Sequence, residues 1–115
     1  MAKTNADLRD RALKQLGLIQ EGDSATGYQA DRADDAIEIS RQELIEYEVC
    51  YWADDSIPEE IYDHYSKYIA GKVAFEFLTD ERAAVWDSIG ERALMKMKAM
   101  TSQKWSGQPT QTDNF

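Results

Sequence analysis

The chain has 115 residues and a net charge of −9 at pH 7, from 13 basic and 22 acidic side chains. This length fits one domain and excludes a large multidomain enzyme. The acidic balance disfavours tight DNA binding, which needs a basic face to displace counterions from phosphates. A single cysteine, Cys50, excludes an internal disulfide and a thiolate zinc cluster, and a single histidine, His64, leaves little material for nucleophilic catalysis.

The first predicted helix begins after Thr4, whose hydroxyl can cap it, with Asp7 three residues later facing the positive end of the helix dipole. Gly17 is the expected end, because glycine readily adopts the left-handed conformation that terminates helices. Residues 18–25, which contain a Gly-Asp-Ser run, are predicted to form a loop. The apolar residues at helical spacing are Leu8, Ala12, Leu13 and Leu16.

The second predicted helix begins at Thr26, which has the spacing of a capping box with Gln29, and continues to Asp54 and Asp55. Its apolar stripe is broad, which indicates contact with more than one neighbouring helix. The stripe consists of Ala30, Ala33, Ile37, Ser40, Leu44, Tyr47 and Tyr51, and a second line of Ile45, Val49 and Trp52 lies beside it.

The third predicted helix begins at Ser56, which repeats the capping-box spacing with Glu59 and places Pro58 in the first turn. Residues 68–78 are apolar on almost every side, which predicts the central and most buried helix. Its inner face consists of Ile61, Tyr65, Tyr68, Ile69, Val73 and Phe77. A fourth helix, capped by Thr79 or Asp80, frays near Gln103, and its stripe is Trp86, Ile89, Ala93, Met97 and Met100.

These elements predict an all-α, four-helix bundle-like domain over residues 1–103 and an irregular C-terminal arm over residues 104–115. The last twelve residues are polar, contain Gly107 and Pro109, and lack helical periodicity. They nevertheless carry two aromatic residues, Trp105 and Phe115, that have no core to enter. We therefore expect this arm to bind a partner, since aromatic residues often anchor protein interfaces.

Metal and cofactor sites find little support in the sequence. His64 follows Glu60 by four residues, so both could share a helix face, but a helical di-iron site needs a glutamate at the position of Ile61. An exposed or core-edge histidine is the simpler interpretation. We expect no cofactor, no metal and no catalysis, and a small metalloenzyme using Glu60 and His64 stays as a minor alternative. No apolar run approaches the roughly 20 residues of a membrane helix, so we expect no membrane contact.

The order of elements resembles the head-to-tail connector (adaptor, or head completion) proteins of tailed bacteriophages. The resemblance is carried by DLRDRALKQLGLI at 7–19, DRADDAIEISRQELIEY at 31–47, SIPEEIYDHYSKYIAGKVAFEF at 56–77 and ERAAVWDSIGERALMKMKAM at 81–100. It implies an all-α subunit of a ring, usually of twelve copies, that sits beneath the portal protein in the neck of the virion. Such a ring extends the DNA channel and docks tail or nozzle proteins, and genomic DNA passes through it without specific binding.

The resemblance also implies roles for particular residues. The arm at 104–115 would bind the portal protein through Lys104, Trp105, Pro109 and Phe115. The second and fourth helices would face neighbouring copies. The protein would be made in the host bacterial cytoplasm before it joins the virion. A basic first helix and an acidic second helix offer complementary surfaces for such a ring. The expected interface residues are Arg9, Arg11, Ile45, Trp52, Trp86 and Met97.

Charge in the sequence is uneven, because residues 21–60 hold thirteen acidic and two basic side chains. This acidity indicates either a solvated helix face or a surface that keeps polyanions away. An acidic wall repels phosphates within a Debye length of about 8–10 Å, so we expect part of 31–60 to line or rim the channel. The expected channel residues are Asp34, Asp35, Glu38, Asp54 and Asp55. The main alternative is an acidic DNA-mimic inhibitor of a nuclease or repressor.

Overall fold

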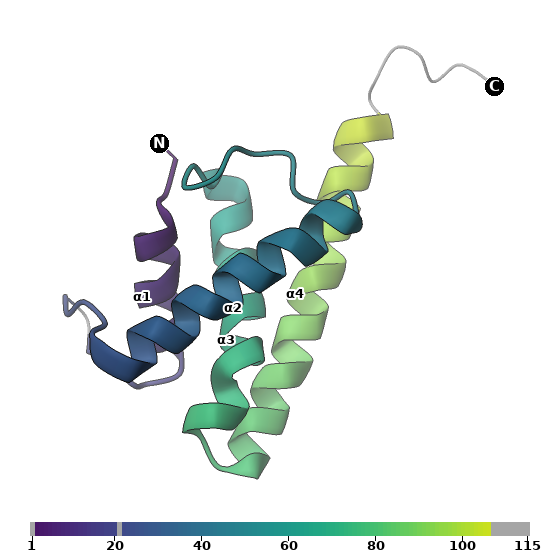
Figure 1. Cartoon of the computed structure of the whole chain (residues 1–115). Coiled ribbons are helices and arrows are strands. Elements are labelled where there is room, and N and C mark those ends of the chain that lie inside the picture. Colours follow the sequence, from purple (N-terminus) through teal and green to yellow (C-terminus); the bar gives the residue numbers. More distant parts are fainter. Residues whose placement is uncertain (1, 21, 107–115) are drawn as a thin grey trace.

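The computed structural model describes residues 2–20 and 22–106, with side chains described as far as Ser102. It contains four helices, α1 (Asn5–Gln15), α2 (Gly27–Glu46), α3 (Glu59–Phe77) and α4 (Asp80–Ser106), shown in Figure 1. Within the described ranges there is no strand, only an isolated antiparallel bridge between Lys3 and Ile57. The predicted all-α, four-helix bundle-like fold is confirmed. The described helices include none long and apolar enough to cross a membrane.

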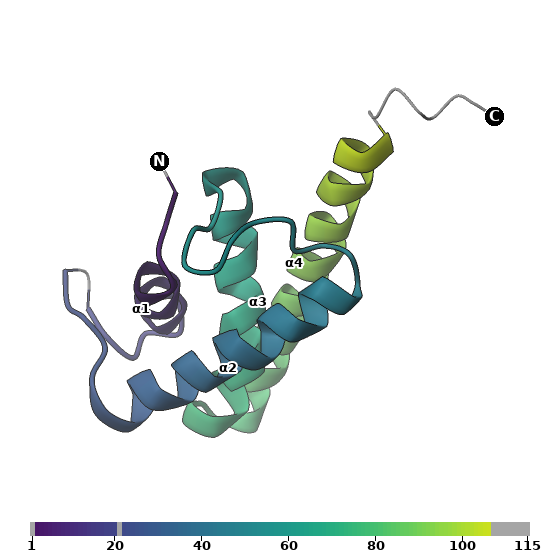
Figure 2. The ribbon, with the colours of Figure 1, turned by 45° about the horizontal axis from the view of Figure 1, so that its top comes forward.

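Helix α3 is the centre of the structure, because it contacts each of the other three helices. It forms an antiparallel hairpin with α4, and α2 crosses it diagonally (Figures 1 and 2). Helix α1 packs against both α2 and α3. The prediction that the third helix is the most central is therefore confirmed. Fully buried core side chains come from all four helices and include Leu13, Leu44, Tyr65, Ile69 and Met97.

Both ends of α1 follow the local sequence signals. The Thr4 hydroxyl accepts a hydrogen bond from the Asp7 amide, and the Asp7 carboxylate accepts one from the Thr4 amide, each at 3.1 Å. This reciprocal capping bond lowers the pKa of Asp7. Gly17 has a φ of +78°, and the next amide, of Leu18, donates to the Leu13 carbonyl at 3.0 Å. The predicted cap and end of this helix are confirmed.

Helix α2 ends at Glu46, so the prediction that it continues to Asp54 and Asp55 is wrong. Glu48 adopts a φ of 61°, and the Val49 amide donates to the Leu44 carbonyl at 2.8 Å. This is the bonding pattern of a Schellman end, formed here without glycine. Residues 47–58 form a loop that returns Trp52 to the core beside Tyr65, with ring centroids 5.7 Å apart.

Two predicted capping boxes do not form. Thr26 is the N-cap residue of α2, but its side chain makes no capping hydrogen bond. Helix α3 begins at Glu59, after Pro58 as N-cap residue, so Ser56 lies outside it. The Ser56 amide instead donates to the Ala53 carbonyl at 3.1 Å, in a turn in which Asp55 has a φ of 62°.

Helix α4 continues to Ser106, so the predicted end near Gln103 is three residues too early. Lys104 and Trp105 consequently lie in its last helical turn and not in an irregular segment. Pro109 and Phe115, the other two predicted arm residues, lie outside the described residues.

Candidate interaction surfaces

The exposed face of α2 is acidic and has no exposed cation. Its two arginines are half-buried and engaged within the chain. The Arg32 guanidinium pairs with Glu76 at 2.8 Å, which raises the pKa of Arg32, and the Arg41 guanidinium donates to the Trp52 carbonyl at 3.3 Å. The helix therefore presents carboxylates to its surroundings, although two of them, Asp34 and Asp35, also pair within the chain with Arg9 and Arg32. These exposed residues are Asp31, Asp34, Asp35, Glu38 and Glu46.

The five predicted channel residues are all exposed, but they do not form a single cluster. Asp34, Glu38 and Asp54 line one hollow of about 410 Å³ beside the half-buried Arg41. Asp35 lies on the side of α2 that faces α3, where it pairs with Arg32.

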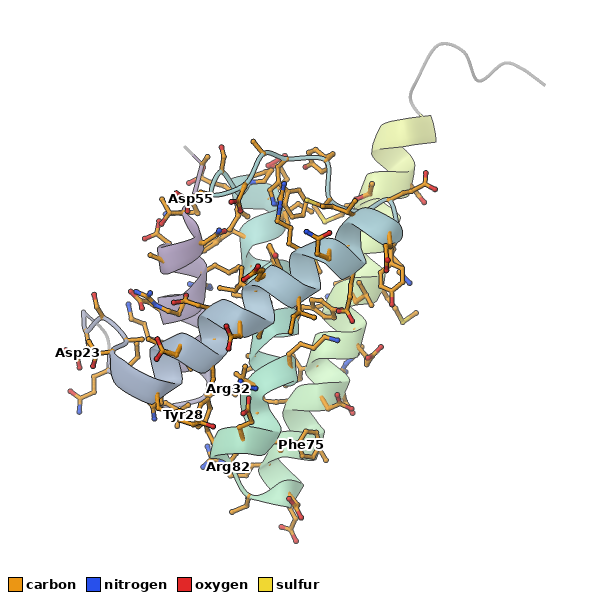
Figure 3. The ribbon with its side chains drawn as sticks, in the orientation of Figure 1. Asp23, Tyr28, Arg32, Asp55, Phe75 and Arg82 are labelled. Atoms are coloured by element: carbon orange, nitrogen blue, oxygen red, sulfur yellow. The ribbon has the colours of Figure 1, made fainter. Side chains whose placement is uncertain are left out.

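Asp55, the fifth of these residues, has a structural role at the start of α1. Its carboxylate accepts a hydrogen bond from the Asn5 amide at 2.7 Å, where the helix dipole favours negative charge. Figure 3 shows Asp55 near the start of α1, far from Tyr28 and Arg32 at the beginning of α2. Asp55 therefore helps to attach the 47–58 loop to α1.

A second hollow, of about 470 Å³, lies between α2 and α3. Ile39 is 62% exposed at its edge, and the buried Val73 forms part of its wall. The Ser40 hydroxyl, which also lines the hollow, is buried and has no hydrogen-bond partner among the described residues. The Lys72 ammonium pairs with Glu43 at 3.1 Å, so the polar groups at this edge are largely engaged within the chain.

A third hollow, of about 440 Å³ and mainly polar, lies between α1 and α3. The Arg11 guanidinium and the Lys3 ammonium each lie 5.5 Å from the centre of the Tyr62 ring. Arg11 also donates to the Asp63 carboxylate at 2.7 Å, which lowers the pKa of Asp63. The Tyr62 hydroxyl donates to the Asp7 carbonyl at 3.0 Å, and burial raises the Tyr62 pKa.

The six predicted interface residues are in different environments. Trp52 and Met97 are 8% and 0% exposed, so these two are core residues and present no surface to a second copy. Ile45 is 44% exposed and Trp86 is half-buried. Both remain accessible from outside.

The two predicted cations of the first helix are already paired within the chain. The Arg9 side chain is 19% exposed and contacts Asp10 at 3.1 Å and Asp34 at 3.5 Å. Arg11 pairs with Asp63. The expected complementarity between a basic first helix and an acidic second helix is thus satisfied in part inside one molecule, by Arg9 and Asp34.

Exposed apolar side chains on α3 and α4 were not anticipated from the sequence. Phe75, Val85 and Met95 are 53%, 58% and 68% exposed. A spacing signal exists for Val85, because it lies three residues after Arg82 and seven before Arg92, on a side of α4 that carries charged residues. Phe75 lies in the 68–78 segment, where no face is clearly polar, so the sequence does not distinguish its outer position.

The residues that could bind a metal or act as a nucleophile have little structural support for such roles. Among the residues that the structure describes, no group of three or more His, Cys, Asp and Glu side chains could hold a metal ion. The Glu60 and His64 pair therefore has no third ligand there. Cys50 is half-buried, and the Arg41 guanidinium donates to its sulfur at 3.2 Å. Burial raises the pKa of the Cys50 thiol, which disfavours the reactive thiolate.

Comparison of the chain with protein-family models, with curated proteins and with solved structures finds no match.

Proposed function

We propose that this protein is a structural subunit of the head-to-tail connector of a tailed bacteriophage. It would form a ring under the portal protein, extend the DNA channel and dock the tail. The observation that carries the proposal is the exposed face of α2, which presents five carboxylates and no exposed cation. A surface of this kind repels DNA phosphates at close range, as the wall of a DNA conduit must.

The C-terminal segment supplies the proposed contact with the portal protein. Because Lys104 and Trp105 lie in the last turn of α4, this contact would begin on a helix and continue into residues 107–115. Helix α4 extends past the other helices at this end (Figure 1), so its last turn is available to a large partner. Aromatic and basic residues of this kind are frequent anchors of protein interfaces.

The test is to mix the purified chain with the portal ring of the same phage and to measure the mass of the complex by light scattering. We expect the full chain to bind and a chain truncated after Gln103, which lacks the whole 104–115 arm, to bind at least about tenfold more weakly. A variant with Gln108→Ala and Gln111→Ala, which keeps Phe115, serves as the control and should bind normally. Unchanged binding after truncation would contradict the arm assignment. Failure of the full chain to bind the ring would contradict the proposed function.

The alternative function is DNA mimicry, and the hollow lined by Asp34, Glu38 and Asp54 is the observation that favours it. A mimic needs carboxylates spread over much of its surface. Helix α4 instead exposes Arg82, Arg92 and Lys96, which weighs against mimicry. A tight one-to-one complex with a soluble nuclease or repressor, measured by light scattering, would support the mimic over the connector.

A further inference from the structure

The hollow between α2 and α3 contains a buried polar group that the chain itself does not use. Ser40 lines this hollow and is 1% exposed, and its hydroxyl makes no hydrogen bond with any described residue. A serine within a helix can donate to the carbonyl oxygen four residues earlier, but the Ser40 hydroxyl forms no such bond. A buried hydroxyl without a partner is unfavourable. A group that enters the hollow and bonds to Ser40 would remove this unfavourable feature.

Apolar side chains form much of the lining. Val73 is buried, Ala36 is half-buried, and Ile39 is 62% exposed at the edge. The volume of about 470 Å³ lies in the range of about 300–1,000 Å³ that is typical of binding sites. The hollow therefore suits an apolar body whose far end carries one hydrogen-bonding group.

Two ion pairs connect the helices beside this hollow. The Arg32 guanidinium pairs with Glu76 at 2.8 Å, and the Lys72 ammonium pairs with Glu43 at 3.1 Å. Each pair joins α2 to α3, and both cations line the hollow (Figure 3 labels Arg32). Because both cations are engaged within the chain, neither is free to attract a carboxylate or a phosphate. The hollow therefore disfavours an anionic occupant.

The uncompensated charge at the hollow is negative. Glu38 is exposed, lines the hollow and makes no ion pair with any described residue. The lining as a whole has three carboxylates and two cations. A cation placed beside the apolar body would meet Glu38 at the edge, where both charges stay in contact with water. The charge at the edge therefore favours a basic occupant.

We infer that this hollow binds a tyrosine side chain carried by a basic segment of another protein, with the ring beside Ile39 and Val73 and the hydroxyl bonded to Ser40. Tyrosine has an apolar ring and a polar group at its far end. Tryptophan carries its N–H on the side of the ring system, and serine and threonine have no comparable apolar body. A charged group would lose its hydration on reaching Ser40. The inference does not rest on the proposed function, because it uses neither a ring nor the portal contact.

The occupant is a segment of another protein and not a free small molecule or a second copy. Sites for small molecules bury about 70–90% of the ligand, whereas this hollow opens to solvent beside the exposed Ile39. The chain has two exposed tyrosines of its own. Tyr47 stands between the exposed Glu46 and Glu48, which would repel Glu38. Tyr28 packs edge-on against the Phe77 ring, with centroids 6.0 Å apart.

The test uses three capped tripeptides as probes, Lys-Tyr-Lys, Lys-Phe-Lys and Glu-Tyr-Glu. The first two have the same charge and differ only by the phenol hydroxyl. In NMR titrations of the full chain at low salt, we expect Lys-Tyr-Lys to shift the amides of Ile39, Ser40 and Val73 and to saturate with a dissociation constant of about 1–10 mM. Lys-Phe-Lys should bind at least about threefold more weakly, because it cannot bond to Ser40. Glu-Tyr-Glu should also bind more weakly, since Glu38 repels it.

Ser40→Ala is the decisive variant. It should bind Lys-Tyr-Lys at least about threefold more weakly than the natural chain and should no longer distinguish it from Lys-Phe-Lys. The Ser40 hydroxyl makes no bond within the described chain, so the variant should fold, and circular dichroism verifies this. Ser88→Ala makes the same change at an exposed position of α4, and this control should bind Lys-Tyr-Lys normally.

Several results would overturn the inference. They are the absence of saturable shifts at the hollow up to about 10 mM peptide, equal affinity for the two lysine peptides, and normal Lys-Tyr-Lys binding by Ser40→Ala. Free 4-methylphenol that binds as tightly as Lys-Tyr-Lys would assign the hollow to a small molecule instead. Self-association in sedimentation velocity that Ser40→Ala abolishes would assign it to a second copy. The portal-binding measurement does not depend on this hollow, so the proposed function is judged separately.

Discussion

A close approach of α3 and α4 at Gly71 predicts that Gly71→Ala destabilises the protein. A Cβ atom added at Gly71 would lie 2.8 Å from the carbonyl oxygen of Trp86 and 3.3 Å from the Cα of Gly90. Both neighbouring atoms belong to the backbone of α4 and cannot rotate away. The α3–α4 hairpin must therefore separate locally, which loosens the packing of the buried residues around it.

The size of the effect follows from two opposing contributions. Alanine is favoured over glycine in a helix interior by about 1 kcal/mol, which alone would stabilise the variant. Overpacking of a well-filled contact costs about 1–3 kcal/mol, and here the clash is with the backbone, so we take the upper part of that range. The expected net loss is about 1–2 kcal/mol in the free energy of unfolding.

Gly90→Ala is the matched control, because it makes the same chemical change at the same crossing. Its added Cβ would lie 3.4 Å from its nearest neighbours, the Cα of Gly71 and the carbonyl oxygen of Lys67, which is ordinary contact. We expect its stability to lie within about 1 kcal/mol of the natural chain. Urea unfolding followed by circular dichroism measures both variants. A Gly71→Ala variant as stable as the natural chain would refute the close approach of α3 and α4.

Three further predictions concern buried or paired polar groups. Ser40→Ala should raise stability by about 1 kcal/mol in urea unfolding, because its hydroxyl is buried without a partner, whereas the control Ser66→Ala should lower it, since that hydroxyl donates to the Asp63 carbonyl at 2.7 Å. Burial, and after it the bond to Glu43, raises the pKa of Tyr68. The contribution of Tyr68 to the free energy of unfolding should therefore be fully present below a pH of about 10 and be lost as the pH rises further, and the free energy of unfolding of Tyr68→Phe should fall less steeply with pH. The bond from Arg11 lowers the pKa of Asp63, so the stability it contributes should be present above pH of about 4 and lost as pH falls further, and Asp63→Asn should flatten this acid limb of the curve.

The sequence predicts the parts of the fold that depend on local bonding and helical spacing. The ends of α1 follow from Thr4, Asp7 and Gly17, whose conformational preferences act within a few residues. The inner face of α3 follows from apolar spacing, and Tyr65, Ile69 and Val73 are buried as expected. These features need no knowledge of the rest of the chain.

The boundaries that the sequence misses depend on tertiary contacts. Nothing local marks the end of α2, because Glu48 adopts the left-handed conformation that glycine usually supplies. Packing compensates for this, since Val49 and Trp52 of the following loop are buried. Ser56 has the correct spacing for a cap, but the adjacent Ile57 is held in a bridge with Lys3, so α3 begins only after Pro58.

The surfaces are predicted even less completely, because composition gives charge but not pairing. The acidity of residues 31–60 is evident from the sequence, and the structure confirms that Asp34, Asp35 and Glu38 are exposed. The sequence does not reveal that Arg9 pairs with Asp34 inside the chain, or that Trp52 and Met97 are enclosed by the core. Each of these depends on contacts between elements that are distant in sequence.

The pairing of charges within the chain bears directly on how copies could associate. The arginines of α2 pair within the chain and leave its outer carboxylates exposed, whereas Arg82, Arg92 and Lys96 of α4 are exposed and make no ion pair with any described residue. A two-fold dimer through the exposed face of α2, or through the exposed cations of α4, would place like charges opposite each other, which is unfavourable. A head-to-tail contact places unlike charges together at every step. The charge distribution therefore favours open chains or closed rings over a symmetric dimer, and added salt should weaken such an assembly.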